Sequence, residues 1–259
     1  MIPPLSITDS NLTSSTVPET DYSAWSSGTT YTIGQRVILT STHKIYESLQ
    51  NSNLNKNPAT DTSSPPYWIE VSPTNRWKMF DTNNSTQTAQ ANSIVVVITP
   101  GRVINSVALL GVEGTSVRIK QTDPTDGVVY DTTFNLNNNG NINNWYNYFF
   151  DPISRKTSVI ATDLKAYGSA AIEITITYTG FTAKCGVCVL GSTQLIGEGI
   201  NLGASVGIQD YSRKEKDTFG NYILIQRSYS KRAKFSMAVL NEQIDALQDL
   251  LVSLRTTPC

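Results

Sequence analysis

The most reactive side chains are one histidine and three cysteines, and neither residue type stands in a pattern that supports catalysis. A Ser-His-Asp or Cys-His device would need His43, which lies in a polar turn between two short predicted strands. Cys185 and Cys188 form a single C-x-x-C in a predicted strand, where residues three apart point to opposite faces. We therefore expect a turn histidine, two small core cysteines, no metal site and no cofactor.

A pair of carboxylates is harder to exclude, because glycoside hydrolysis needs only two Asp or Glu side chains about 5–10 Å apart. Turn structure accounts for several of the acidic residues, which precede Pro or Gly. Phosphate-binding glycine motifs are missing from the sequence. We expect no catalytic residue and no enzymatic activity. The acidic residues that could be considered by type alone are Asp81, Asp123, Asp126, Asp131, Asp151 and Glu173.

One constellation has a functional mechanism, a cluster of aromatic residues between positions 21 and 72. Pyranose rings have apolar faces that stack on flat aromatic side chains, while polar neighbours bind the hydroxyls. The same rings can form the core of a small unit, which has little core unless large aromatics fill it. Composition alone favours the core, and both interpretations stay open. The candidate carbohydrate-binding residues are Trp25, Tyr31, Tyr46, Tyr67 and Trp68.

The elements that position these residues are predicted to be mainly β. Hydrophobic residues make up 39% and charged residues 16% of the chain, and Ser, Thr and Asn fill much of the remainder. Residues 73–200 read as many short strands between turns, Trp145–Phe150 among them. In Ala171–Thr179, isoleucines alternate with polar residues, as in a half-buried strand. This spacing predicts an antiparallel, jelly-roll-like β-sandwich.

Changes in composition divide the chain into four segments. Residues 1–20 are rich in Ser, Thr and Pro and are expected to form an extended N-terminal arm. Residues 21–72 are expected to form a small aromatic-rich β module, and residues 73–200 the sandwich. Residues 201–259 predict a long β-hairpin followed by one amphipathic α-helix over Glu242–Leu254. This last segment is too small for a core of its own, so it must pack on the sandwich or on another subunit.

The charge pattern excludes some classes of partner. Lys and Arg number 20 against 21 Asp and Glu, so no large field points to nucleic acid or to an anionic membrane. The basic residues Arg227, Lys231, Arg232 and Lys234 are interpreted as a solvated or interface-rim strand face. Without an apolar run of about 18 residues we expect no membrane insertion. The sequence also shows no signal peptide, so we expect assembly in a cytoplasm.

The module at residues 21–72 resembles carbohydrate-binding modules of the chitin-binding type, families 5 and 12. The matching residues are Ala24-Trp25, Tyr31-x-x-Gly34-x-x-Val37, Tyr46-x-Ser48, Asn57-Pro58 and Trp68. The resemblance implies that some aromatics form the core while others face a sugar, and that a glycan is a candidate ligand. The sequence departs from the enzyme-linked members of these families because no catalytic domain follows the module.

Beyond this module the chain resembles tail or virion proteins of tailed bacteriophages. The resemblance runs from Trp25 to Thr257 and is carried by residues 74–81, 144–150, 203–214 and 217–221. It implies a structural protein of the tail, neck or baseplate region, assembled in the bacterial host cytoplasm. Such a protein would form homo-oligomers, contact other virion proteins and display the module. The alternative is a receptor-binding protein of the tail-fibre or tailspike kind that adsorbs to host-surface glycans.

Overall fold

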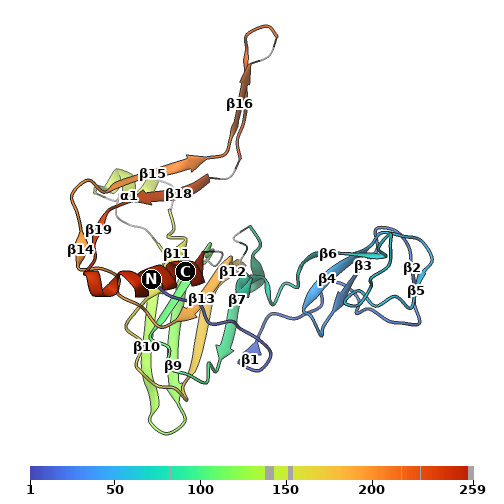
Figure 1. Cartoon of the computed structure of the whole chain (residues 1–259), viewed down its shortest axis with the longest axis horizontal. Helices are drawn as coiled ribbons and strands as arrows, with labels where there is room; N and C mark the ends of the chain where they lie inside the picture. Colours follow the sequence, from blue (N-terminus) through green and yellow to red (C-terminus); the bar gives the residue numbers. More distant parts are fainter. Residues whose placement is uncertain are drawn as a thin grey trace. The chain divides into compact units, whose positions relative to one another are not determined.

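The computed structural model describes residues 1–81, 83, 85–137, 143–150, 154–216, 218–227 and 229–255 (Figure 1). The chain divides into two compact units. The main unit is residues 2–193. The C-terminal unit contains Met1 and, among the described residues, those from 194 to 255. The division therefore falls a few residues before position 200, where the composition had placed it.

The centre of the main unit is a β-sandwich of two antiparallel sheets, which confirms the predicted fold class. The strand order is β1-β7-β12-β9-β10 in the first sheet and β11-β8-β13 in the second. All pairings within both sheets are antiparallel. The strand bounds are β1 Leu12–Ser15, β7 Thr88–Ile98, β8 Ser106–Leu110, β9 Ser116–Asp123, β10 Gly127–Asn135, β11 Ser158–Ala161, β12 Ala171–Cys185 and β13 Val187–Gly191.

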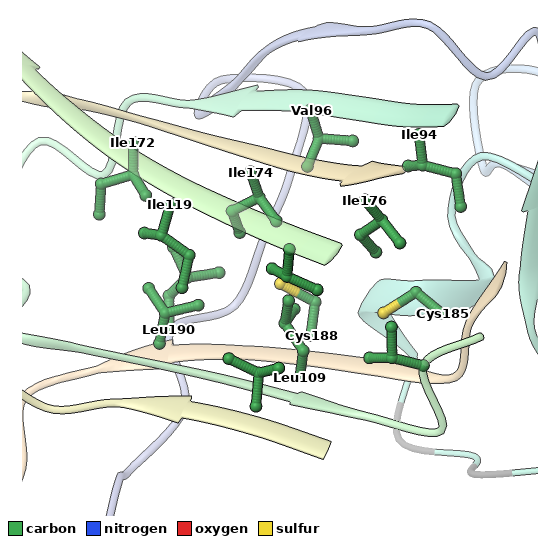
Figure 2. Close-up of a cluster of buried hydrophobic side chains, with 14 of the residues drawn as sticks. Ile94, Val96, Leu109, Ile119, Ile172, Ile174, Ile176, Cys185, Cys188 and Leu190 are labelled. Carbon is green, nitrogen blue, oxygen red and sulfur yellow. The ribbon is translucent and has the colours of Figure 1, made fainter. Parts of the chain in front are cut away.

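The core lies between the two sheets and is formed by alternate residues of the longer strands. Ile172, Ile174 and Ile176 of β12 are buried, because successive side chains of a strand point to opposite faces. In register with them, β7 contributes Ile98, Val96 and Ile94. Figure 2 shows how residues of both sheets meet there, and the labelled partners from the second sheet are Leu109, Cys188 and Leu190.

The chain crosses from one sheet to the other at Gly186. Strand β12 ends at Cys185 in the first sheet, and β13 begins at Val187 in the second. Because of this crossing, Cys185 and Cys188 both lie in the core (Figure 2), so the expectation that they point to opposite faces is wrong. Both are buried free thiols, and the prediction that they are small core residues is confirmed.

The N-terminal segment belongs to the main unit, which corrects the picture of a separate extended arm. Strand β1 pairs with β7, and the backbone N–H of Leu5 donates to the carbonyl oxygen of Leu190 at 2.7 Å. Val17 is fully buried in the sandwich core, and Ile2 packs in a second apolar cluster with β8 and β13. Backbone pairing attaches this segment, and backbone pairing needs few apolar side chains.

The aromatic-rich module forms two small antiparallel sheets with a core of their own. One sheet has the order β3-β4-β6 and the other pairs β2 with β5. Its buried cluster contains Tyr31, Val37, Tyr46 and Trp68. A short 3-10 helix, η1 (Lys78–Phe80), then leads into the sandwich. The bounds are β2 Thr30–Tyr31, β3 Arg36–Leu39, β4 Lys44–Ser48, β5 Asn53–Leu54 and β6 Trp68–Pro73.

Residues 145–150 form a helix, α1 (Trp145–Phe150), where the sequence predicted a strand. The side-chain oxygen of Asn144 accepts the backbone N–H of Asn147 at 2.8 Å, which is the geometry of a helix N-cap. Rings four residues apart then contact each other, Trp145 with Phe149 and Tyr146 with Phe150. The capping contact decides the conformation here, and the high strand propensity of the aromatic residues does not.

The C-terminal unit is a long two-stranded ribbon followed by a helix (Figure 1), as the sequence predicted. Three antiparallel pairs make up the ribbon: β14 with β19, β15 with β18, and β16 with β17. Helix α2 (Ile244–Leu254) follows the 3-10 turn η2 (Asn241–Gln243) and starts two residues later than expected. The bounds are β14 Gly199–Ile200, β15 Ser205–Asp210, β16 Arg213–Lys216, β17 Tyr222–Ile225, β18 Tyr229–Lys234 and β19 Met237–Ala238.

Candidate functional site

Three of the five candidate carbohydrate-binding residues are core residues of the module. Tyr31, Tyr46 and Trp68 expose only 7%, 6% and 6% of their surface. The rings of Tyr31 and Trp68 meet edge to face at 5.2 Å, and the indole N–H of Trp68 donates to the carbonyl oxygen of Lys56 at 2.8 Å. A stacking platform needs an open ring face, so these three residues hold the module together and leave no such face free.

The other two candidates, Trp25 and Tyr67, are half-buried and pack against this core. The ammonium nitrogen of Lys56 lies 5.1 Å from the ring centroid of Tyr67, within the range of a cation–π contact. The backbone N–H of Tyr67 donates to Asp61 Oδ2 at 2.7 Å. Trp25 and Tyr67 are therefore the two candidates whose aromatic surface remains partly open to a ligand.

Sequence reasoning missed a polar cluster beside Tyr22, an exposed aromatic residue of the same module. Arg36 donates from Nε to Glu47 Oε2 at 2.7 Å and from Nη1 to the hydroxyl of Tyr22 at 3.3 Å. Its guanidinium carbon lies 6.0 Å from the centre of the Tyr22 ring. Hydrogen bonds to Tyr22 and Glu47 raise the pKa of Arg36. Only the pairing of β3 with β4 brings Arg36 next to Glu47.

His43 lies in the turn between β3 and β4, as expected, and is engaged on both ring nitrogens. Nδ1 lies 3.1 Å from Glu19 Oε1, and Nε2 lies 2.9 Å from Asp9 Oδ2. The ring stacks on Trp77 with the centroids 4.2 Å apart. An open cavity of about 450 Å³ adjoins this cluster. Because both nitrogens already contact carboxylates, the imidazole serves here as a structural link between the N-terminal segment, the module and Trp77.

The acidic residues considered for catalysis take part in local structure. Asp123 accepts hydrogen bonds from the Ser169 hydroxyl at 2.5 Å and from the backbone N–H groups of Thr125 and Asp126. The first of these contacts holds the pKa of Asp123 below its usual value, and the ion pair with Arg118 does the same for the pKa of Asp131. A general acid needs a raised pKa, so neither residue fits that role.

The remaining acidic candidates also have partners or lie in strands. Asp126 accepts the hydroxyl hydrogen of Tyr167 at 2.9 Å. Asp81 accepts the backbone N–H of Asn83 at 2.8 Å and the hydroxyl of Thr86 at 2.7 Å. Glu173 is in register with Lys120 on the neighbouring strand. Asp151 lies outside the described residues.

A surface that the sequence did not single out is the short helix α1. Its five aromatic side chains are 61–78% exposed, and Asn144 and Asn147 lie among them. We refer to these five residues as the aromatic helix. The sequence contains a signal for this helix: five aromatic residues within six positions directly follow an asparagine that can cap a helix. The exposed rings are Trp145, Tyr146, Tyr148, Phe149 and Phe150.

The described part of the chain shows neither a metal-binding cluster nor a membrane-spanning helix. Its His, Cys, Asp and Glu side chains form no group of three or more that could hold a metal ion. None of its helices is long and apolar enough to cross a membrane.

Comparison with known proteins gives a weak structural likeness. No family model and no curated protein matches the chain. Among solved structures, the chain is similar to a chitosan-binding module from a chitosanase/glucanase of Paenibacillus sp. IK-5, at 13% identity and a TM-score of 0.30. The match covers 45% of this chain and 83% of that one.

Proposed function

We propose that this chain is a structural protein of a tailed-bacteriophage particle, located in the tail, neck or baseplate region. It assembles with copies of itself and with other particle proteins, and it displays the module at residues 21–72. It acts by binding rather than by catalysis. Assembly takes place in the cytoplasm of the bacterial host, and the mature location is the virion.

The observation that carries this proposal is the exposure of apolar side chains in the C-terminal unit. Among its described residues, none is buried, and large apolar side chains such as Leu202, Val206 and Phe219 are exposed. A two-stranded ribbon has no interior and is at best marginally stable alone in water. Exposed apolar patches of this extent are typical of surfaces that other proteins cover. Subunits of larger assemblies present such surfaces to the proteins that cover them.

The display of the module has separate support. Its core of Tyr31, Val37, Tyr46 and Trp68 is distinct from the sandwich core. Its exposed apolar residues include Ile33 in a turn, Leu54 in β5, and Ile69 and Val71 in β6. A module with its own core can project from an assembly while the sandwich and the ribbon make the subunit contacts.

The test is electron microscopy of the intact particle with the chain located and its copies counted. A closed ring of copies in the tail, neck or baseplate region would support the proposal. Absence of the chain from purified particles would overturn it.

The second candidate function is adsorption to host-surface glycans, which the aromatic helix favours. Flat, exposed rings supply stacking surface for a sugar. The half-buried rings of Trp25 and Tyr67 provide a smaller surface of the same type.

The glycan function is tested with Trp145→Ala, Tyr146→Ala and Tyr67→Ala, each assayed for binding to host polysaccharide. If it is correct, binding falls at least tenfold while the melting temperature stays unchanged. The control is Phe219→Ala, an exposed ring of the ribbon. Unchanged binding in all three variants would exclude these rings as the glycan site.

A further inference from the structure

The ribbon carries a charge opposite to that of the rest of the chain. Residues 201–240 contain seven Lys or Arg and three Asp or Glu, a net charge of +4. The whole chain has a net charge of −1, so the remaining residues together carry −5. The excess of positive charge in this nearly neutral chain therefore lies in the ribbon.

Within the described residues, three of the basic side chains on the ribbon have no acidic partner. The ion pairs of the ribbon are local: Arg213 with Glu215 at 2.6 Å and Lys214 with Asp210 at 3.0 Å. For Lys231, Arg232 and Lys234 of β18, the described residues provide no carboxylate partner, and all three are exposed. Arg232 and Lys234 share one face of β18 and Lys231 lies on the other face, so the first two charges repel each other unless an acidic surface lies opposite.

The ribbon is also apolar on faces that a solvated hairpin would keep polar. Val206 and Ile208 share one face of β15, and all four residues of β17 are 45–69% exposed. A strand that is apolar on both faces is typical of a strand covered on both faces. Phosphates of a nucleic acid would match the Lys and Arg residues and leave these side chains in water. A protein surface that is both acidic and apolar matches the whole ribbon.

Helix α2 of the same chain has such a surface. Its inner side, with Ala246, Leu247 and Leu250, faces residues 194–197 across a cavity of about 200 Å³. Beside this inner side, Asp245 and Asp249 lie four residues apart on one face of the helix, and Glu242 of the preceding turn η2 stands three residues before Asp245. The exposed side chain of Val252, three residues after Asp249, lies beside this acidic face.

We propose that the ribbon of one copy docks on the acidic face of helix α2 of a second copy. The cationic side chains of β18 meet Glu242, Asp245 and Asp249 from both faces of the strand: Lys231 from the face that also carries Val206 and Ile208, and Arg232 and Lys234 from the opposite face. Apolar side chains that adjoin the contact leave water. Two different surfaces meet, so the contact is heterologous and repeats around a ring or along a fibre. This inference rests on the proposed assembly function and identifies the partner as a second copy.

The experiment uses two charge-reversed forms of the full chain, studied by analytical ultracentrifugation. The ribbon variant combines Lys231→Glu, Arg232→Glu and Lys234→Glu. The helix variant combines Glu242→Lys, Asp245→Lys and Asp249→Lys. Each variant alone now has like charges on both surfaces, and we expect its self-association to be weakened about 100-fold or more. An equimolar mixture restores both pairings, so the mixture assembles as the parent chain does.

The matched control combines Arg102→Glu, Lys156→Glu and Lys165→Glu, three exposed residues of the main unit. It changes the net charge as much as the ribbon variant and should assemble normally. Rescue in the mixture also excludes misfolding as the reason why the single variants fail. For the parent chain, raising the salt concentration from 0.05 to 0.5 M should weaken association about tenfold or more.

Three outcomes would overturn the inference. They are a parent chain that is monomeric at every concentration, a mixture that stays monomeric, and loss of oligonucleotide binding in the ribbon variant with no change in mass. The proposed function is tested separately in the particle. A chain that is present in the particle but contacts only other proteins would keep the assembly function and reject the contact between copies.

Discussion

Trp68 shows at the scale of a single residue how the module depends on its aromatic core. Its ring meets Tyr31 edge to face, and its indole N–H satisfies a backbone carbonyl. We expect Trp68→Ala to cost about 3–5 kcal/mol, because the residue is buried and leaves a large cavity. So small a module has little stability to lose, so its transition in chemical denaturation should disappear at 25 °C.

The matched comparison is Tyr67→Ala, which removes a ring that is only half-buried. Its loss should leave the module folded, with a melting temperature close to that of the parent chain. Equal destabilisation by both variants would contradict the distinction between core rings and open rings.

Asp123 gives a residue-scale prediction for pH. Hydrogen bonds from Ser169 and from the backbone N–H groups of Thr125 and Asp126 lower its folded-state pKa. The unfolded value is about 3.9, so the ionised carboxylate stabilises the folded chain above that pH. This contribution is lost as the pH falls through the lower, folded-state pKa.

Urea unfolding between pH 7 and pH 2 measures this effect. Asp123→Asn should lower the stability at pH 7 and flatten its decline with acid relative to the parent chain. Ser169→Ala should show a smaller change in the same direction. An unchanged pH profile in the Asn variant would mean that Asp123 does not contribute to acid sensitivity.

At the scale of an element, the crossing between β12 and β13 depends on the absence of a side chain at position 186. A Cβ built on Gly186 would lie 3.1 Å from the carbonyl oxygen of Leu110, which belongs to the paired strand β8. We expect Gly186→Ala to destabilise the main unit by about 1–3 kcal/mol through overpacking. The control is Gly168→Ala, whose Cβ would meet only ordinary contacts at 3.8 Å or more. Thermal unfolding of the two variants compares these effects.

The two cysteines that flank this crossing give a chemical readout of the same element. Burial raises the pKa of Cys185 to about 12, so its thiol should not react with an aromatic disulfide reagent in the folded chain at pH 8. The same should hold for Cys188. A chain with Cys259→Ser removes the background from the third cysteine. Labelling of that chain before unfolding would show that the crossing opens in the native state.

At the scale of the whole molecule, the two units differ in what stabilises them. The sandwich core and the module core both lie in residues 2–193, whereas the described part of the C-terminal unit buries no side chain. We therefore expect a chain ending at Thr193 to keep the melting temperature of the full chain and to lose its self-association. Calorimetry and analytical ultracentrifugation measure the two properties. Unfolding of the shortened chain would show that the ribbon and helix stabilise the sandwich directly.

The candidate site was predictable only in part, for reasons that particular residues make clear. Composition placed the aromatic rings of the module in one segment, but it could not separate Tyr46, which is buried, from Tyr67, which is half-open. That separation depends on how β4 and β6 pair. The sequence predicted a strand for the aromatic helix, because aromatic residues favour strands. The structure has a helix there, because the cap at Asn144 outweighs that preference.

By itself the sequence determined the properties that depend on neighbours along the chain. Alternation in Ala171–Thr179 fixed which isoleucines are buried, and spacing of apolar residues fixed the final helix, because periodicity is local. Tertiary structure alone decided the contacts between distant segments. It joined β1 to β7, brought Cys185 and Cys188 into one core, and placed His43 between Asp9 and Glu19. Such pairings depend on long-range strand register, which short stretches of sequence do not encode.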